Sequence, residues 1–231
     1  MKKGILLMSG LLALHLMSCA QSSGNKEKRR DNSPGGVSRI ADYVRGKGLD
    51  GYQVATFAGG CFWCTEASFD RLLGVAGVIS GYTGGHTDYP TYAEVCAEQT
   101  GHAEAVRIYF DTTVISYANL LKVFFVAHDP TQLNRQGPDR GESYRSAIFC
   151  HHSGQRKQAE QMIADLTASG NFAEPIVTQV ADAKEFWVAE EYHQNYYPQN
   201  PYQPYIRGVS RPKVEKVEQT FSTWLKEKRS F

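Results

Sequence analysis

The sequence has almost no net charge, no long apolar run beyond its first twenty residues, and few cysteines. Its 231 residues carry a formal net charge of +1, which gives no electrostatic reason to propose a nucleic acid as partner. No stretch after residue 20 is long and apolar enough to span a bilayer. We find no internal repeat and no second domain. With 42% hydrophobic residues, the chain is predicted to form one globular domain with a substantial core, preceded by a short leader.

The first twenty residues have the pattern of an export signal. Two lysines precede an apolar run over residues 5–17, which small residues end at Ser18, Cys19 and Ala20. This order is typical of a secretory signal peptide rather than a membrane span or a buried helix. Residues 16–19, L-M-S-C, also resemble a bacterial lipobox. The resemblance implies lipidation of Cys19, and an exported protein anchored to a bacterial membrane in the cell envelope or periplasm.

A polar segment follows the leader. Residues 21–36 read Q-S-S-G-N-K-E-K-R-R-D-N-S-P-G-G, a charged and Gly/Ser-rich composition that is typical of a disordered linker. We therefore predict a lipoprotein-type signal peptide over residues 1–19, a disordered linker over residues 20–50 and one folded domain over residues 51–231.

Strand and helix patterns alternate irregularly in the folded domain, with long loops between them. Strands are predicted over residues 52–57, 75–82, 103–110, 144–150 and 176–180. Helices are predicted over residues 61–73, 116–128, 153–168, the first part of 186–197, and 210–225. This order fits an α+β fold, a ferredoxin-like two-layer α/β sandwich around a mixed β-sheet, better than a doubly wound parallel sheet.

Glu104 stands out in the strand predicted over residues 103–110. It shares a face with the apolar residues Val106, Ile108 and Phe110, because side chains alternate along a strand. A carboxylate on the core face either turns to solvent at the strand end or is a buried acid. The periodicity leaves these two alternatives evenly matched.

Four cysteines remain when Cys19 is set aside: Cys61, Cys64, Cys96 and Cys150. Two structural disulfides are possible in an exported protein, but a domain of this size can fold without them. Cys61 begins a predicted helix, where the backbone N–H groups and the helix dipole favour a thiolate. Cys64 lies on the same helix face within about 5–6 Å, close enough for a disulfide after a small adjustment.

Three chemistries compete for this cysteine pair. A C-x-x-C motif alone suggests thioredoxin-like thiol–disulfide exchange. A zinc site built from the four cysteines is disfavoured, because the second pair is not C-x-x-C and no histidines have matching spacing. The third is a thiolate-based reductase that acts on an oxidised sulfur. Phe62 and Trp63, between the two cysteines, favour this third function because they can form an apolar pocket.

Several motifs in this chain look like those of the A-type peptide methionine sulfoxide reductases. They are G-C-F-W-C (60–64) with Glu66, S-G-Y-T-G-G (80–85), T-G-H-A-E (100–104), H-D-P (128–130), Y-R-S (144–146) and E-Y-H-Q (191–194). They occur in that family's order over roughly residues 54–208. Members of the family reduce the S epimer of methionine sulfoxide, in proteins or as the free amino acid.

The resemblance implies a role for each matching residue. Cys61 would attack the sulfoxide sulfur, release methionine and become a sulfenic acid. Glu104 would protonate the oxygen, with a pKa raised by desolvation. Tyr82 and Tyr144 would donate hydrogen bonds to that oxygen.

The substrate itself would be held by other residues. The resemblance implies that Phe62 and Trp63 contact its methyl group. Asp129 would bind the substrate backbone or amino group, or orient the site through water. On the residues alone, Asp129 could equally cap a turn before Pro130, and we expect a structural role for His193.

Regeneration of the thiol departs from the family's commonest pattern. Many relatives use a cysteine in the C-terminal tail, but no cysteine follows Cys150 in this sequence. We therefore expect Cys64 to resolve the sulfenic acid, and thioredoxin or a thioredoxin-like envelope protein to reduce the Cys61–Cys64 disulfide. Cys96 and Cys150 are expected to be packed thiols. We expect no metal, no organic cofactor and a monomer.

Overall fold

The computed structural model describes residues 37–227. The predicted signal peptide, Cys19 and the linker up to residue 36 lie outside the described residues. Residues 38–43 form a strand, β1 (Ser38–Arg39), and a short helix, α1 (Ile40–Tyr43). Val37 and Ile40 are buried, so the linker predicted over residues 20–50 does not extend to residue 50. Its polar composition belongs to residues 21–36, and the apolar side chains that follow already pack in the domain.

Seven strands form one mixed sheet. They are β1, β2 (Gln53–Gly59), β3 (Val75–Thr83), β4 (Ala103–Phe110), β7 (Ser146–Cys150), β8 (Gln179–Asp182) and β9 (Phe186–Val188). Their order is β1-β9-β3-β4-β2-β7-β8. Only β7 and β8 pair in parallel, so the predicted mixed sheet is confirmed. A separate hairpin joins β5 (Arg135–Gln136) and β6 (Asp139–Arg140).

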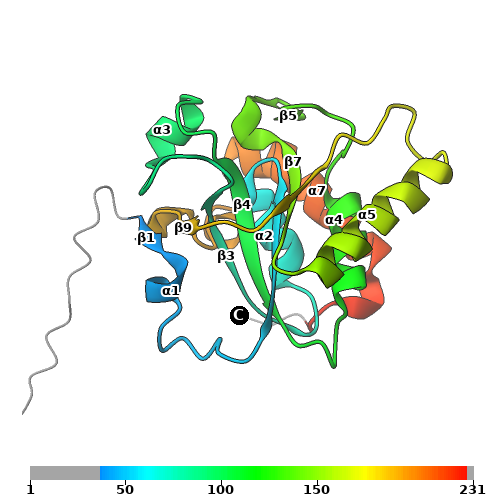
Figure 1. Ribbon diagram of the computed structural model, residues 1–231, viewed down its shortest axis with the longest axis horizontal. Coiled ribbons are helices and arrows are strands. Elements are labelled where there is room, and N and C mark those ends of the chain that lie inside the picture. The colour runs from blue at the N-terminus through cyan, green and yellow to red at the C-terminus, as the bar shows by residue number, and fades with distance from the viewer. Residues whose placement is uncertain (1–36, 228–231) are drawn as a thin grey trace, which may run out of the picture. The chain divides into compact units, whose positions relative to one another are not determined.

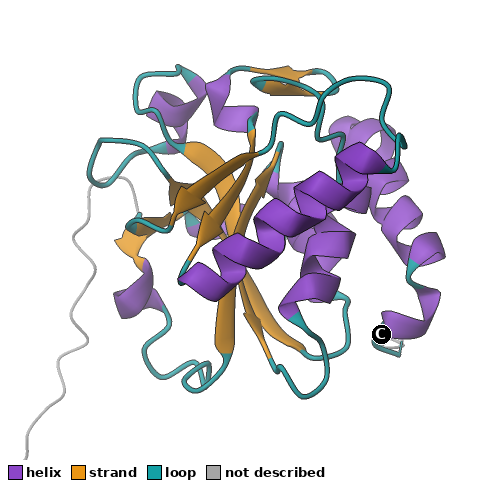
Figure 2. Ribbon diagram, turned by 45° about the vertical axis from the view of Figure 1, so that its right-hand side comes forward, coloured by secondary structure: helices purple, strands orange, loops and turns teal. Residues whose placement is uncertain are grey.

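The longer helices pack beside the sheet (Figures 1 and 2). They are α2 (Phe62–Asp70), α4 (Tyr117–Ala127), α5 (Ser153–Ala168) and α7 (Arg211–Thr220). Phe57, Val106 and Phe124 belong to the large apolar core shared by the sheet and these helices. A second cluster, which includes Ala58 and Ala105, lies on the opposite side of the same strands. The predicted α+β sandwich is thus confirmed.

Several residues of the sequence motifs lie in shorter helices. They are α3 (Tyr92–Cys96), α6 (Tyr196–Gln199), three 3₁₀ helices (Glu142–Tyr144, Glu191–His193, Ser222–Trp224) and a π-helix (Ile206–Ser210). The π-helix runs directly into α7.

The local sequence patterns predicted the bounds of some helices and strands correctly and those of others wrongly. β4 and α5 have the predicted bounds, and the Ser116 hydroxyl caps α4 by accepting from the backbone N–H of Asn119. The helix predicted at the start of residues 186–197 is wrong. That segment forms β9, because it pairs with β3, and tertiary pairing overrides the ambiguous pattern of a short aromatic run.

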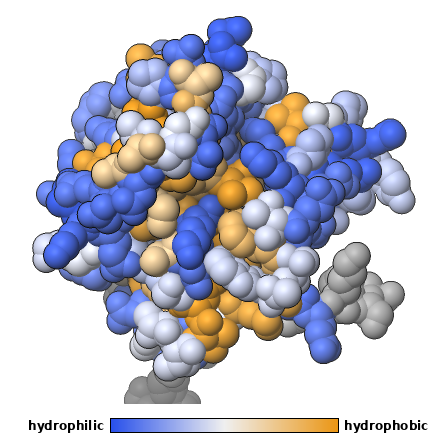
Figure 3. Space-filling model, turned by 90° about the vertical axis from the view of Figure 1, so that its right-hand side faces the viewer, coloured by the Kyte–Doolittle hydropathy of each residue, from blue (hydrophilic) through white to orange (hydrophobic). Residues whose placement is uncertain are grey.

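The helical side of the domain is mostly polar on its surface. Figure 3 shows this side, with hydrophilic side chains over most of it and hydrophobic ones gathered in a band between them. Within residues 37–227, none of the helices combines the length and the apolar composition needed to cross a membrane.

Candidate active site

The turn between β2 and α2 sets the position of Cys61. Gly60 has a φ of +83°, a backbone conformation that glycine adopts without strain. A Cβ atom at Gly60 would also meet the Cβ of Gln136 at 2.5 Å. The chain can therefore turn sharply here, and Cys61 becomes the N-cap of α2, with 5% of the residue exposed.

The two thiols of the motif have different environments. Burial raises the pKa of Cys61 well above its ordinary value, and the interactions with Cys64 and Glu104 raise it further. The pKa of Cys64 falls to about 7, chiefly through its hydrogen bond with Cys61 and despite burial, with contributions from Lys213 and Ser210. Burial therefore opposes the thiolate that the helix N-terminus is expected to favour at Cys61.

Glu104 is a buried acid, which decides between the two alternatives that its strand position left open. It is 2% exposed, and its Oε2 accepts a hydrogen bond from the backbone N–H of Phe62 at 3.0 Å. Burial raises the pKa of Glu104 to about 8, so the carboxyl group keeps its proton at neutral pH. A proton donor is thus held against the first peptide of α2, directly after Cys61.

The tyrosines near Glu104 have different partners. Tyr82 pairs with Glu104 in the β3–β4 register, but its fully buried hydroxyl donates to Oε2 of Glu190 at 2.8 Å. Burial raises the pKa of Tyr144 and of Tyr92, and the Glu104 charge is the next cause for both. Tyr92 was not singled out from the sequence. The T-Y-A-E pattern over residues 91–94 is a capping box that starts α3, and it could have placed Tyr92 at the first position of a helix.

An aromatic cluster surrounds Phe62 and Trp63. The Trp63 ring stacks on Tyr196 with centroids 3.9 Å apart and meets Tyr205 edge-on at 5.8 Å. Its Nε1 donates to Nδ1 of His193 at 3.1 Å. Burial lowers the pKa of His193 to about 4, so this imidazole is neutral and can accept the bond. His193 thereby fixes the Trp63 ring, an orienting role.

Asp129 bonds within its own turn. Its carboxylate accepts from the backbone N–H of Thr131 at 3.0 Å and from the Thr131 hydroxyl at 2.7 Å. This geometry corresponds to the turn-capping alternative. Asp139 in β6 lies closer to the reactive groups, since it accepts from the Tyr205 hydroxyl and its charge raises the pKa of Glu104.

The cysteines within residues 37–227 are all free. Cys150 is buried in the core, as expected of a packed thiol. Cys96 is exposed at the end of α3, where the Tyr92 hydroxyl hydrogen-bonds it, so the packed-thiol expectation is wrong for Cys96. No group of three or more His, Cys, Asp or Glu side chains in this part of the chain could hold a metal ion.

Comparison with known proteins identifies close relatives. Residues 53–225 match the family model described as peptide methionine sulfoxide reductase. The peptide methionine sulfoxide reductase MsrA of Natronomonas pharaonis is 51% identical over 168 residues, covering 73% of this chain and 94% of that protein. The MsrA of Chromobacterium violaceum is 53% identical over 171 residues, covering 74% of this chain and 97% of that protein.

A solved structure supports the same relationship. Methionine sulfoxide reductase A of Corynebacterium diphtheriae superposes with a TM-score of 0.60 at 34% sequence identity. The match covers 68% of this chain and 80% of that one.

Proposed function

This chain belongs to the peptide methionine sulfoxide reductase family, and we propose that it reduces the S epimer of methionine sulfoxide with Cys61 as nucleophile. Family membership makes it an oxidoreductase that uses thiols to reduce methionine sulfoxide. It does not favour the alternative of a thioredoxin-like exchanger. The observation that carries the proposed mechanism is the buried Glu104 carboxyl, which accepts from the Phe62 N–H directly after Cys61.

The first step transfers oxygen from substrate to enzyme. The Cys61 sulfur attacks the sulfoxide sulfur while Glu104 protonates the oxygen, whose bond to sulfur breaks. In balance, one thiol and one sulfoxide give one sulfenic acid and one methionine. Glu104 contributes to the raised pKa of both Tyr144 and Tyr92, and their hydroxyl groups would hydrogen-bond the oxygen. Tyr82, which donates to Glu190, would support this oxygen site from the adjacent strand.

The substrate methyl group would lie against Phe62 and Trp63. Phe62 is buried and Trp63 is partly exposed, so together they offer an apolar surface that begins inside the protein and reaches its exterior. The polar end of the substrate would meet Asp139 rather than Asp129, because the Asp129 carboxylate bonds within its own turn. Oxidised proteins and free methionine sulfoxide are both suitable substrates for such a surface site.

The second half of the cycle would regenerate the thiols. Cys64 would attack the Cys61 sulfenic acid, and thioredoxin or a thioredoxin-like protein would reduce the disulfide. Two features of Cys64 support this role: it lies one helical turn from Cys61, and its pKa is lowered to about 7. No metal or organic cofactor takes part in this cycle.

The test is an assay with separated epimers. Purified protein with dithiothreitol should convert the S epimer to methionine and leave the R epimer untouched. Cys61→Ser should abolish the conversion. Cys150→Ser, the matched control, also changes a buried thiol but should retain the conversion, because Cys150 lies in the core. Full activity of Cys61→Ser, or reduction of the R epimer instead, would refute the proposal.

We further propose that the protein is exported and anchored by a lipid on Cys19, as a monomer in the cell envelope. The supporting observation is the L-M-S-C pattern after an apolar run. Expression with a fatty-acid probe should label the wild type and not Cys19→Ala. Equal labelling of both would contradict the anchor.

A further inference from the structure

The second thiol of the motif has neighbours of its own, contributed by the last helical segment. We infer that Ser210 and Lys213 form a thiolate-holding site for Cys64 and act as positioning residues for the step that resolves the sulfenic acid. This inference rests on the proposed resolving role of Cys64, and it adds two residues to which no sequence motif pointed.

Ser210 provides the direct contact. It is fully buried, and its Oγ lies 3.1 Å from Sγ of Cys64. The residue ends the π-helix (Ile206–Ser210) that runs into α7, and π turns occur mostly as local features at functional sites. A serine hydroxyl can accept from a thiol and, after rotation, donate to a thiolate. Ser210 can therefore hold Cys64 in both protonation states.

Lys213 provides the charge. It follows Ser210 by three residues, on the same face of the helical segment. Its Nζ is buried and has no hydrogen-bond partner within residues 37–227. An unpaired buried ammonium group is costly, and an anion forming opposite it offsets that cost. The Cys64 thiolate is such an anion.

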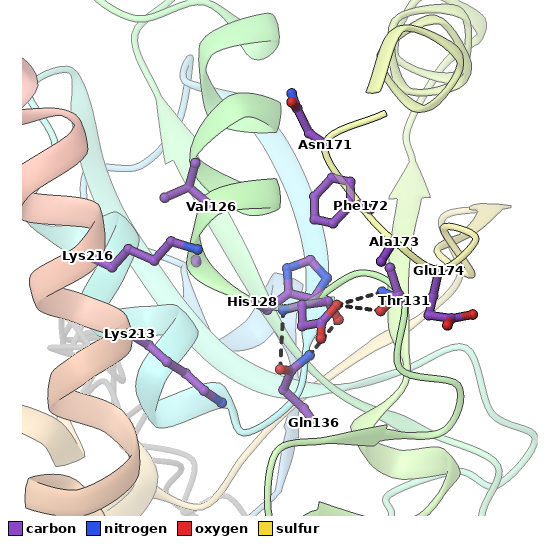
Figure 4. Close-up of a pocket in the computed structure, with 12 residues that line it drawn as sticks. Val126, His128, Thr131, Gln136, Asn171, Phe172, Ala173, Glu174, Lys213 and Lys216 are labelled. Atoms are coloured by element: carbon purple, nitrogen blue, oxygen red, sulfur yellow. Dashed lines mark hydrogen bonds between the residues drawn. The ribbon is translucent and has the colours of Figure 1, made fainter. Parts of the chain in front are cut away.

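The cavity beside α7 shows where the lysine points. Its volume is about 520 Å³, and Lys213, Lys216 and Gln136 are among its lining residues. In Figure 4 the Lys213 side chain runs toward Gln136, whereas Lys216 runs toward Val126. The Gln136 side chain approaches Gly60, the glycine before Cys61, so Lys213 extends toward a residue that contacts the β2–α2 turn, whereas Lys216 does not.

The groups that face Cys64 carry charges of both signs. The hydrogen bond with Cys61 is the main cause of its lowered pKa, Lys213 and Ser210 lower it further, and burial and the Asp139 charge oppose them. The remaining titratable neighbours are Glu104 and Tyr205. Oxidation of Cys61 replaces its thiol by a sulfenic acid. Lys213 and Ser210 are unchanged by that oxidation and still favour the thiolate when it must attack.

The step balances without an external oxidant. The Cys64 thiolate attacks the Cys61 sulfur, an S–S bond forms, and the S–O bond of the sulfenic acid breaks. The leaving hydroxide takes one proton and departs as water. The sulfenic sulfur is reduced and the Cys64 sulfur is oxidised, so that both share the disulfide oxidation state.

A single-turnover experiment separates this step from oxygen transfer. Reduced full-length enzyme is mixed with S-epimer methionine sulfoxide without reductant, at pH 6 to 9. Methionine is measured by chromatography and the intramolecular disulfide by mass spectrometry after acid quench and thiol alkylation. Lys213→Met is compared with Lys216→Met, a change of the same charge on the same helix and cavity.

We expect Lys213→Met to release methionine at the wild-type rate but to form the disulfide more slowly. A rise of about one unit in the pKa of Cys64 lowers the thiolate fraction by nearly tenfold at any pH well below that pKa, so the slowing should be greatest at pH 6. At pH 9 the variant should equal or exceed the wild type, because a more basic thiolate is the better nucleophile. Lys213→Arg should restore the pH profile, Ser210→Ala should shift it in the same direction, and Lys216→Met should not move it.

Two results would overturn the inference. An unshifted pH profile in Lys213→Met, or slowing by the same factor at every pH, would mean that the lysine has no electrostatic role. Two other results would instead contradict the proposed function on which the inference rests. If Cys64→Ser still forms an intramolecular disulfide at the wild-type rate, Cys64 is not the resolving residue and the inference falls with it. If wild type forms no methionine, the reductase function itself fails.

Discussion

Two carboxylic acids, Glu104 in β4 and Glu66 in α2, are equally buried and have similarly raised pKa values. Each is 2% exposed, and burial raises the pKa of each to about 8. Each accepts one backbone N–H bond, Glu104 from Phe62 at 3.0 Å and Glu66 from Asn195 at 2.9 Å. By burial and pKa alone, either could be the acid of the reaction.

The residues around each carboxyl group distinguish Glu104 from Glu66. Glu104 accepts from the first peptide N–H after Cys61, and its charge raises the pKa of Cys61, Tyr92 and Tyr144. Glu66 holds the left-handed backbone of Asn195, next to the loop that carries the histidine bound to Trp63. A raised pKa by itself therefore indicates only that a carboxyl group is buried. Sulfur and hydroxyl groups near that carboxyl group are what make it a candidate for catalysis.

The largest effect is expected from Glu104→Gln. Glutamine keeps the shape and can still accept from the Phe62 N–H, but it cannot give a proton to the substrate oxygen. Methionine release in a single turnover should fall by at least about a hundredfold, the scale of general acid catalysis. The wild-type rate should also decline as pH rises through about 8, because Glu104 then loses its proton.

The matched control is Glu66→Gln, which removes an equally buried acid. A rate loss of similar size in both variants would mean that burial of a carboxyl group, rather than its neighbours, is what the reaction requires. An undiminished rate in Glu104→Gln would remove Glu104 from the acid role.

A smaller effect is expected from removing a neighbour of Glu104. Tyr92→Phe deletes one hydroxyl that would bond the substrate oxygen. Methionine release should fall by roughly tenfold, which corresponds to about 1.5 kcal/mol, the lower end of what a hydrogen bond to a charged group contributes. Tyr82→Phe should affect the rate less, because the Tyr82 hydroxyl already donates to Glu190. Single-turnover rates measured at constant pH, alongside the thermal midpoint of each variant, test this order. A larger rate loss in Tyr82→Phe would reverse the assignment.

Sequence patterns predicted the centre of the site better than its periphery. The alternation of β4 placed Glu104 on the core face, and the G-G-C-F-W-C motif placed Cys61 at a helix start, because both signals are local. The strand pairing of β9 depends on a partner about a hundred residues away in β3, and no periodicity within three residues encodes it. Residues 37–43 were assigned to the linker because their few apolar side chains follow a long polar segment.

Four of the missed site residues share one property, which Tyr92 and Asp139 do not have. Glu190, Tyr205, Ser210 and Lys213 come from the last fifth of the described chain, where elements are short. Each meets the site through a tertiary contact, such as that of Tyr205 with Asp139 or of Ser210 with Cys64. Only the fold reveals such contacts.

The smallest effect on activity, and a measurable one on stability, is expected from Glu66→Gln. The pKa of Glu66 is about 8 in the folded protein, above its ordinary value of 4.5, so the folded state binds this proton more tightly than the unfolded state. Its contribution to stability is therefore fully present below about pH 4.5 and is lost as pH rises toward 8. Glutamine has no charge to bury. The thermal midpoint of Glu66→Gln should match the wild type near pH 5 and exceed it by about 3 °C or more at pH 8.5, with methionine release within about twofold of wild type because Glu66 touches neither thiol. A midpoint below wild type at pH 8.5 would show that the Asn195 contact needs the carboxylate.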